Sequence, residues 1–521
     1  MPTPTVPTNA DTTTHSDQAN YLALKARDAR FDGRFFTGVT STGIYCRPVC
    51  KVRTPRAENC RFFTLASQAE AAGFRPCMRC RPELAPSALH VLGARAWSTQ
   101  DASAILARQA AGLLDAPQLW SDGCPSMAQT AQRLGVSERH LRRIFETHWG
   151  VSPLQYLQTR RLLTAKQLLT DTHLPIAQVA ALSGFASVRR FNTVFAEQYR
   201  FQPRALRKAG SDAEGTVPAD HSGVRCKLAY RPPLDATALL QFFATRALDG
   251  VEHVDLPTHT LARTLALDWA GQHLQGWVQL RVDEVRCEVQ ALVSESLIAA
   301  LPLVLVRLRA LLDLDADPNA IHAVLSPSFP NSAGLRVPGT LDGFELAVRA
   351  VLGQQITVQA ARTLGARLVA RFGAPLATPV TGLTHLFPTP QVLRHASDDD
   401  LGQLGIVRQR QNAIRALAAA MADGALVLNP SADVPGTVAA LQALPGLGPW
   451  TAQYIAMRAL RWPDAFPAGD VALQKALGVR DAKRPALAAE QASHAWQPWR
   501  SYATVRAWSG NHVDPSTTET L

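Results

Sequence analysis

No apolar run in this sequence of 521 residues reaches the length of about 18 residues that a membrane-spanning helix needs. The amino-terminal segment MPTPTVPTNADTTTHSDQAN is polar, and it lacks the basic start and apolar middle of an export signal. We therefore expect no membrane span and no export, and we expect residues 1–18 to form a disordered tail.

Cysteine is also scarce, with 8 residues in the whole chain. Four of these cysteines form two tight pairs, Cys46 with Cys50 and Cys77 with Cys80. In a chain without an export signal, the reducing cytoplasm makes metal binding a better explanation for such pairs than disulfides.

Acidic residues are few in two amino-terminal stretches. Residues 19–88 hold 12 Lys and Arg against 5 Asp and Glu, and residues 133–208 hold 13 against 4. The two stretches thus carry net charges of +7 and +9 in a chain whose total is +11, so the remainder is acidic. This concentration favours a polyanionic partner, because neutralising phosphates releases counterions. A basic surface that is merely solvated is the alternative.

The length predicts several domains, because one hydrophobic core rarely serves so many residues. The stretch 210–223 (GSDAEGTVPADHSG) lacks apolar periodicity, as linkers do, and a looser join lies around 85–125. Between these joins a helical pattern occurs twice, beginning at Ala131 and at Ala180. Residues 278–282 and 285–292 alternate as half-buried strands do, and helical patterns return from Gly343 onward.

The cysteine pairs have the spacing Cys46-x3-Cys50 and Cys77-x2-Cys80, with 26 residues between them. Two such pairs on two turns can bring four thiolates to the corners of a tetrahedron, the geometry that zinc prefers. A site that only staples a small domain is one explanation. A thiolate kept ionised by zinc is also a nucleophile, and nearby cations would bring a phosphate to it. The basic residues around the cysteines are Arg47, Lys51, Arg53, Arg56, Arg75, Arg79 and Arg81.

Residues 19–88 resemble the amino-terminal domain of the Ada family, the bacterial sensors of DNA methylation damage, in FDGRFFTGVTSTGIYCRPVC, AENCRFF and AAGFRPCMRC. The resemblance implies that Cys46 accepts a methyl group from a methylphosphotriester in the DNA backbone. It also implies that Cys50, Cys77 and Cys80 complete a Zn²⁺ site with Cys46. Methylation would remove negative charge next to DNA and tighten binding to phosphates. Cys60 belongs to neither pair, and we expect it to be a small buried residue.

Each helical repeat has Ala-x3-Gly, a short turn and an amphipathic helix, as a helix-turn-helix requires. The second helix of each repeat carries side chains that commonly contact bases or phosphates. A solvated helix face is the alternative for one such helix, and two units in succession make it less attractive. The segment resembles the AraC-type DNA-binding domain, which also follows the zinc domain in the Ada family. The candidate DNA contacts are Arg139, His140, Arg142 and Arg143 in the first repeat and Ser187, Arg189, Arg190 and Asn192 in the second.

In LPGLGPWTAQYIAMRAL, Gly446 and Gly448 form a short turn before a helix. Such a turn exposes backbone N–H groups and lets a phosphate approach closely. Asp470 follows in FPAGDVALQKALG, where it could be a helix N-cap or a functional carboxylate.

Residues 223–512 resemble the helix-hairpin-helix glycosylases, in particular the AlkA family, in LAYRPPLDATALLQFFATRAL, VPGTLDGFELAVRAVLGQQITV, the hairpin and WQPWRSYATVRAW. The resemblance implies that Asp470 is the catalytic carboxylate, which stabilises an oxocarbenium-like sugar and helps water attack it. It places Trp450, Tyr454 and Trp508 in the base pocket. Electron-rich rings attract a cationic alkylated purine by roughly 0.5–2 kcal/mol each. Ordinary core packing is the alternative for these rings.

Two departures from the relatives bear on the reaction. Gln355 occupies the position of the wedge that fills the gap left by a flipped base, where AlkA has an apolar side chain. Relatives that also cut the strand carry a lysine where this chain has Trp450, and no four-cysteine iron–sulfur signature follows. We therefore expect a monofunctional glycosylase that leaves an abasic site. The motif Pro-Cys-His-Arg is absent, so we expect no repair of O6-methylguanine.

Together these features predict a multidomain, mainly α protein with α+β parts. We expect a small zinc domain, a double helix-turn-helix, an antiparallel β-sheet/α domain and an all-α helix-hairpin-helix domain. The expected boundaries are a tail at 1–18, the zinc-binding methyl acceptor at 19–88, the AraC-type domain at 89–208, a linker at 209–222, the AlkA-type amino-terminal domain at 223–334 and the glycosylase domain at 335–521.

The predicted function joins a methylation-sensing transcriptional activator to a glycosylase for bases such as 3-methyladenine. The alternative is a regulator only, whose glycosylase-like half binds DNA without excising bases. The expected partners are alkylated and promoter double-stranded DNA and RNA polymerase, with no membrane. The resemblance also admits a monovalent cation at the hairpin. We expect a monomer in the bacterial cytoplasm, associated with the nucleoid.

Overall fold

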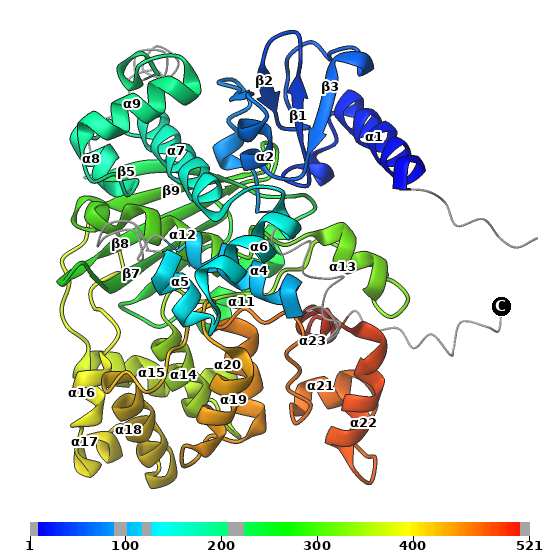
Figure 1. The fold of residues 1–521 in the computed structure, drawn as a ribbon. Coiled ribbons are helices and arrows are strands. Elements are labelled where there is room, and N and C mark those ends of the chain that lie inside the picture. Colours follow the sequence, from blue (N-terminus) through cyan, green and yellow to red (C-terminus); the bar gives the residue numbers. More distant parts are fainter. Residues whose placement is uncertain (1–8, 88–101, 117–126, 207–222, 511–521) are drawn as a thin grey trace, which may run out of the picture. The chain divides into compact units, whose positions relative to one another are not determined.

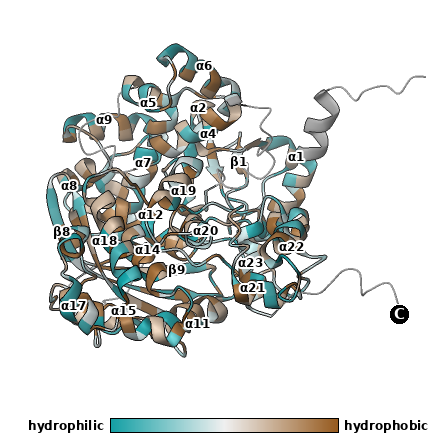
Figure 2. Cartoon of the chain, turned by 90° about the horizontal axis from the view of Figure 1, so that it is seen from below, coloured by the Kyte–Doolittle hydropathy of each residue, from teal (hydrophilic) through white to brown (hydrophobic). Residues whose placement is uncertain are grey.

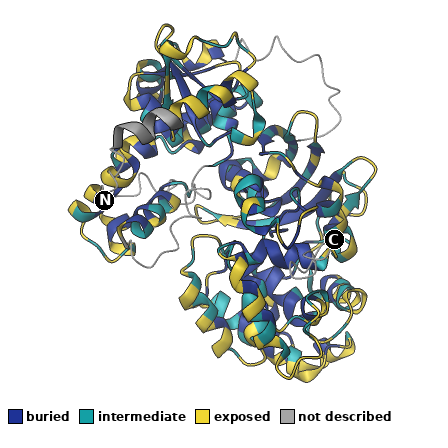
Figure 3. Cartoon of the chain, turned by 90° about the vertical axis from the view of Figure 1, so that its right-hand side faces the viewer, coloured by how far each residue is buried: buried dark blue, intermediate teal, exposed yellow. Residues whose placement is uncertain are grey.

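The structure is a computed structural model that describes residues 9–87, 102–116, 127–206 and 223–510 (Figure 1). The chain divides into two compact units, one of residues 1–217 with 229–232 and the other of residues 218–228 with 233–521. Figure 3 shows buried residues gathered on the strands and on the inner helix faces of the units, with exposed residues along loops and outer faces. None of the helices in the described ranges is both long and apolar enough to cross a membrane.

A small sheet in the first unit brings the cysteine pairs together. Its strands are β1 (Phe36–Val39), β2 (Ile44–Cys46), β3 (Cys60–Phe63) and β4 (Arg75–Pro76), in the order β3-β1-β2-β4. Strand β1 is antiparallel to β2 and β3, whereas β2 is parallel to β4, with Tyr45 opposite Pro76. Because Cys46 ends β2 and Cys77 follows β4, this register places the two pairs side by side.

Helix α1 (Asn9–Ala26) corrects one expectation. The disordered tail predicted for residues 1–18 is wrong for residues 9–18, which are helical, while residues 1–8 lie outside the described ranges. Ala23 and Leu24 are buried near the end of α1. A helix anchored at one end extends at little cost, because adding a turn is easier than nucleating one.

The helical repeats follow the predicted pattern. The first pairs α5 (Met127–Arg133) with α6 (Glu138–Trp149), and the second pairs α8 (Ile176–Leu182) with α9 (Val188–Tyr199). The turns contain Gly135 and Gly184, at φ +67° and +79°, where a side chain would be strained. Helix α4 (Ala102–Leu114) precedes them, and Figure 2 shows both hydrophobic and hydrophilic segments on α6.

Helix α7 (Pro153–Asp171) packs against both the zinc module and the repeats. Its Leu163 packs in one cluster with Phe36, Tyr45 and Phe74 of the zinc module. The Glu70 carboxylate accepts hydrogen bonds from the Tyr45 hydroxyl at 3.0 Å and the Thr159 hydroxyl at 2.7 Å. The zinc module and the helical repeats are therefore parts of one packed unit rather than separate bodies.

The second unit contains a five-stranded sheet in the order β5-β9-β8-β7-β6, in which β6 to β9 pair antiparallel. The predicted strands at 278–282 and 285–292 fall largely within β8 and β9, and the first residues of the second segment form the turn between them. The strands are β5 (Gly223–Ala229), β6 (Glu252–Asp255), β7 (Thr260–Trp269), β8 (Gln272–Asp283) and β9 (Glu288–Ser294), and the helices nearby in sequence are α11 (Ala236–Arg246), α12 (Leu301–Leu311) and α13 (Pro318–Leu325).

The rest of the second unit is helical, which together with the two sheets and the helix-turn-helix pairs confirms the predicted fold class. The hairpin consists of α19, a short turn at Leu444–Gly448 and α20. The helices are α14 (Gly343–Leu352), α15 (Val358–Phe372), α16 (Pro390–Arg394), α17 (Asp398–Gln403), α18 (Arg408–Ala422), α19 (Val434–Ala443), α20 (Pro449–Arg458), α21 (Val471–Ala476), α22 (Pro485–Ala492) and α23 (Arg500–Trp508).

Replacing Glu70 with Gln tests the buried link between the zinc module and α7. Burial raises the pKa of Glu70 to about 7, although hydrogen bonds from Thr159 and Tyr45 oppose the rise. As the pH increases from about 4.3, the unfolded carboxyl loses a proton that the folded one keeps, so stability falls until about pH 7. Glu70→Gln keeps the shape and removes this loss. Its advantage in unfolding free energy should grow from about pH 5 to pH 7 and reach at most about 3 kcal/mol.

The measurement is thermal unfolding of the zinc-loaded chain across this pH range. Glu58→Gln is the matched control, because Glu58 is exposed and, within the described ranges, its one ion pair is with the exposed Arg56. An equal pH response of the two variants would contradict the role of burial at Glu70.

Candidate functional site

The four paired cysteines form one buried cluster in the first unit. Their sulfur atoms all lie within 4.8 Å of one another, and those of Cys50 and Cys77 are 4.0 Å apart. Tetrahedral zinc with Zn–S bonds of about 2.3 Å requires sulfur separations of about 3.8 Å. The donor set and its spacing therefore fit a four-thiolate zinc site.

The electrostatics of the cluster call for a cation. Hydrogen bonds from the other three sulfurs lower the pKa of Cys77, whereas burial raises the pKa of Cys80. The four thiols thus do not ionise alike, since neighbouring thiolates repel one another. A bound divalent cation removes that repulsion and keeps all four sulfurs anionic.

Two of the basic residues near the cysteines form ion pairs within the protein. The Arg47 guanidinium is buried, forms an ion pair with Asp32 and donates to the Cys80 carbonyl at 3.0 Å. Arg81 forms ion pairs with Glu83 at 2.9 Å and Asp171 at 2.6 Å. The expectation that these two attract a phosphate is therefore wrong, because their charges are already neutralised. Exposed basic residues remain near the cluster at Lys51, Arg53, Arg56 and Arg79.

Cys60 is a smaller correction. It is half-buried at the start of β3, and its thiol donates to the Arg56 carbonyl at 3.3 Å. Cys60 lies on β3, an edge strand of the sheet, and the sequence carried no signal for this position.

The predicted DNA contacts of the repeats divide into exposed side chains and caps. Arg139, Arg142 and Arg143 are exposed on α6, and His140 is half-buried. On α9, Arg189 and Arg190 are exposed and Asn192 is half-buried. The Ser187 hydroxyl accepts from the backbone N–H of Arg190 at 3.2 Å, so this serine is the N-cap of α9. Ser137 caps α6 in the same way, a role that a serine directly before an amphipathic helix could have indicated.

The two hairpin glycines serve different purposes. Gly446 has φ +78°, and a Cβ there would lie 2.9 Å from the Cβ of Ala413. Gly448 begins α20 with φ −85°, and a Cβ there would meet nothing within 4 Å. Gly446 is thus required by the turn itself, whereas Gly448 leaves open space at the start of the helix.

Gln355 is exposed in the loop between α14 and α15, at φ +56°. The preceding residue ties this loop to the hairpin. The Gln354 amide donates to the Gly446 carbonyl and to the Thr451 hydroxyl, both at 2.9 Å. The sequence indicated the candidate wedge, but it carried no signal for the anchoring role of Gln354.

Asp470 is the N-cap of α21 and is also held from two other helices. Its Oδ1 accepts from the Leu473 backbone N–H at 2.8 Å and from the Trp508 indole N–H at 3.1 Å. Its Oδ2 accepts from the Trp450 indole N–H at 2.9 Å. A carboxylate offers about four acceptor positions, so one remains open, on Oδ2. The two readings of Asp470 that the sequence left open are thus compatible.

The aromatic side chains predicted for the base pocket lie together beside Asp470. Trp450 and Tyr454 are stacked, with ring centroids 5.4 Å apart and an interplanar angle of 17°. Trp508 is tilted against Tyr454, with centroids 6.3 Å apart. Tyr454 and Trp508 are half-buried rather than sealed in a core, so faces and edges remain accessible.

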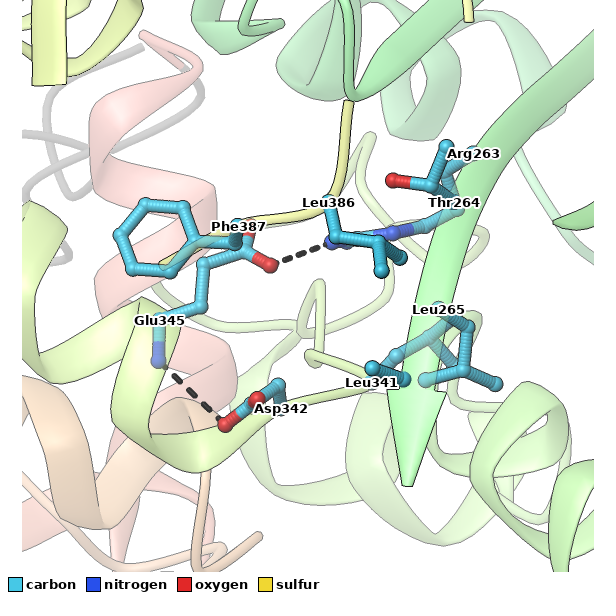
Figure 4. A pocket seen from close by; sticks show the side chains of 9 residues that line it. Arg263, Thr264, Leu265, Leu341, Asp342, Glu345, Leu386 and Phe387 are labelled. Carbon is cyan, nitrogen blue, oxygen red and sulfur yellow. Dashed lines mark hydrogen bonds and ion pairs between the residues drawn. The ribbon is translucent and has the colours of Figure 1, made fainter. Parts of the chain in front are cut away.

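A pocket elsewhere in the second unit, shown in Figure 4, is not this site. Its charged residues Arg263 and Glu345 form an ion pair at 2.6 Å, and Asp342 caps α14. The carboxylates of this pocket are thus already engaged within the protein.

The matching families are described as "Metal binding domain of Ada" at residues 19–83, "Helix-turn-helix domain" at 130–209, "AlkA N-terminal domain" at 225–342 and "HhH-GPD superfamily base excision DNA repair protein" at 348–500. A protein of Mycobacterium tuberculosis named "Probable bifunctional transcriptional activator/DNA repair enzyme AlkA" is 39% identical over 503 residues, 94% of this chain and 95% of that protein. The chain belongs to this family.

Relatives of each half are known separately. The Escherichia coli protein named DNA-3-methyladenine glycosylase 2 is 34% identical over 282 residues, which are 54% of this chain and 95% of that protein. The Escherichia coli protein named bifunctional transcriptional activator/DNA repair enzyme Ada is 33% identical over 154 residues, 30% of this chain and 39% of that protein. Membership in the bifunctional family, with the family matches in each segment, confirms the three resemblances drawn from the sequence.

Substitution of the two hairpin glycines should separate folding from DNA binding. Gly446→Ala should lower the unfolding free energy by about 1–3 kcal/mol, because of the positive φ and the contact with Ala413. Gly448→Ala should leave stability nearly unchanged and weaken binding of duplex DNA, because the new methyl group enters the open space at the start of α20. Denaturant titration and fluorescence anisotropy with labelled DNA measure the two effects. Undiminished DNA binding by Gly448→Ala would show that no phosphate approaches there.

Proposed function

We propose that this member of the bifunctional family senses methylated DNA with its first unit and excises alkylated bases with its second. The observation that carries the proposal is the Asp470 carboxylate, held by three N–H donors beside stacked aromatic rings. A carboxylate held in this way keeps its position while one acceptor site on Oδ2 stays available. That site suits a water molecule that attacks C1′ of the damaged nucleotide. The negative charge suits the oxocarbenium-like sugar that forms as the bond to the base breaks.

The base pocket belongs to the same proposal. Trp450, Tyr454 and Trp508 would hold the flipped base, whose removal from the stack costs a few kcal/mol. Gln355 would enter the gap in the duplex, and its anchored neighbour Gln354 would keep it aligned with the hairpin. The N–H groups behind Gly446 and Gly448 would contact a phosphate. Trp450 has no amine to attack the sugar, so the reaction is hydrolysis without strand cleavage.

In the first unit, Cys46 would accept the methyl group. An electron pair of its sulfur attacks the methyl carbon of a methylphosphotriester, the C–O bond breaks, and the phosphate leaves as an ordinary anionic diester. Zinc held by Cys46, Cys50, Cys77 and Cys80 would keep the sulfur ionised at neutral pH. The product is an uncharged thioether, so the change is stoichiometric and lessens repulsion from DNA.

The helical repeats supply the regulatory part of the proposal. Arg139, His140, Arg142 and Arg143 on α6, and Arg189, Arg190 and Asn192 on α9, would contact promoter DNA, with Ser187 as a cap that can also reach a phosphate. Two units in one chain allow a monomer to contact two segments of the major groove. RNA polymerase as a partner, a monovalent cation at the hairpin and association with the nucleoid are further parts of this proposal.

Asp470→Asn tests the glycosylase reaction. Asparagine keeps the N-cap and the Oδ1 contacts, so the variant should fold, but it removes the negative charge that stabilises the sugar. Single-turnover release of 3-methyladenine from duplex DNA should fall by at least about 100-fold. Equal release by wild type and Asp470→Asn would support the alternative of a regulator whose second unit only binds DNA.

Mass spectrometry of the chain after exposure to DNA containing methylphosphotriesters tests the sensor reaction. One added methyl group is expected on Cys46, none is expected in Cys46→Ser, and Cys60→Ser should behave as wild type because Cys60 is outside the cluster. Transfer to Cys50, or none from zinc-loaded wild type, would contradict the assignment.

A further inference from the structure

Three residues of α20 follow one another at intervals of four, which puts them on one helix face. They are Trp450, Tyr454 and Arg458. Tyr454 in the middle stacks on Trp450, and the Arg458 guanidinium lies 5.3 Å from the centre of the Tyr454 ring. The ring that borders the base pocket therefore has a cation as its other neighbour along the helix.

Arg458 is buried, with 7% of its surface exposed, and is held firmly. Its guanidinium donates to the Tyr454 hydroxyl at 2.5 Å, to the Pro338 carbonyl at 2.8 Å and to the Gly339 carbonyl at 3.1 Å. These partners are all uncharged. Among the described residues, no carboxylate forms an ion pair with Arg458.

Nearby carboxylates are already used by other arginines. Glu252 and Glu345 each form ion pairs with both Arg263 and Arg349, so these four side chains neutralise one another. Arg246 stacks on Phe242 at 3.8 Å, and Arg458 lies 4.8 Å from the same ring. Two positive charges, those of Arg246 and Arg458, thus remain uncompensated by the described residues behind the aromatic wall.

The pKa of the Tyr454 hydroxyl is shifted in the direction that a positive potential predicts. Burial favours the neutral phenol and would raise its pKa, but the charges of Arg458 and Arg246 outweigh burial, and the pKa of Tyr454 is lowered. Burial among like charges also lowers the pKa of Arg246. Both directions agree with the geometry.

A positive potential affects charged and uncharged bases in opposite ways. When the C1′–N bond breaks, the bonding electron pair goes to the base. The attacking water gives its hydroxide to C1′ and releases its other proton. A cationic base leaves as a neutral molecule, so it carries positive charge in the pocket until the bond is broken. An uncharged base gains negative charge as it leaves, and a buried cation stabilises that charge.

We propose that Arg458 is a specificity-determining residue whose buried charge, acting across the Tyr454 ring, favours excision of uncharged damaged bases relative to cationic ones. This inference rests on the proposed glycosylase function of the second unit. Because Arg458 is buried against the Tyr454 ring, it would act through that ring, and the selectivity between the two substrate classes measures its role.

The test compares duplexes that contain one 7-methylguanine, which is cationic, or one hypoxanthine, which is uncharged. Arg458→Met should raise kcat/KM for 7-methylguanine relative to hypoxanthine by roughly tenfold, and Arg458→Lys, which keeps the charge, should stay within about threefold of wild type. Arg461→Met is the matched control. Arg461 also binds the 337–339 loop, through the Val337 carbonyl at 2.8 Å, but it pairs with Asp313 and contacts no pocket ring. Its loss should leave the ratio unchanged.

Equal losses on both substrates in Arg458→Met, or an Arg458→Lys variant that behaves like Arg458→Met, would overturn the inference and leave a structural role. Binding of duplexes with a 2′-fluoro substituent, which prevents cleavage, makes the test independent of turnover. Arg458→Met should then bind the 7-methylguanine duplex about fivefold tighter relative to the hypoxanthine duplex. If wild type excises neither base, the proposed function fails, and this binding ratio still decides the role of Arg458.

Discussion

The carboxylate of Asp470 joins three helices of the second unit through hydrogen bonds. Hydrogen bonds from α20, α21 and α23 converge on its two oxygens. The same two tryptophans that donate these bonds also contact Tyr454, so one set of side chains positions the proposed catalytic carboxylate and the proposed base pocket. A shift of any of the three helices would move the carboxylate and the aromatic rings together.

Holding a negative charge near the surface requires compensation, and the second unit supplies it with neutral N–H donors rather than with a cation beside Asp470. Arg246 and Arg458, which form no ion pair with any carboxylate in the described ranges, instead lie against the rings of Phe242 and Tyr454. In the proposed reaction, this separation would let the carboxylate stabilise positive charge on the sugar while the far side of the pocket stabilises negative charge on the base. The pocket therefore has opposite electrostatic character at its two ends.

The first unit also has to hold negative charges in place, and there a bound cation and the packing of α7 would do so. Four sulfurs lie within 4.8 Å of one another and require a cation to be anionic together. Helix α7 packs Leu163 into the core of the zinc module and shares the Glu70 carboxylate with Tyr45, the residue before Cys46. The residue before Cys46 is thus linked through Glu70 to helix α7, which itself packs against the helical repeats.

The sequence by itself determined the family, the two tight cysteine pairs, the repeated helical pattern and the hairpin with its aspartate, because these depend on local spacing and on residue types that few other structures require. It also predicted the strands at 278–282 and 285–292 from their alternation. It was wrong about residues 9–18 and about Arg47 and Arg81, since helix anchoring and ion pairing depend on distant partners. Only the tertiary structure decided that Asp470 is both cap and held carboxylate, that Gln354 anchors the loop of the candidate wedge, and that Arg458 lies against Tyr454 without an ion pair to any described carboxylate. Each of these depends at least partly on contacts between segments far apart in the chain, such as those of Asp470 with Trp508, Gln354 with Gly446 and Arg458 with Pro338.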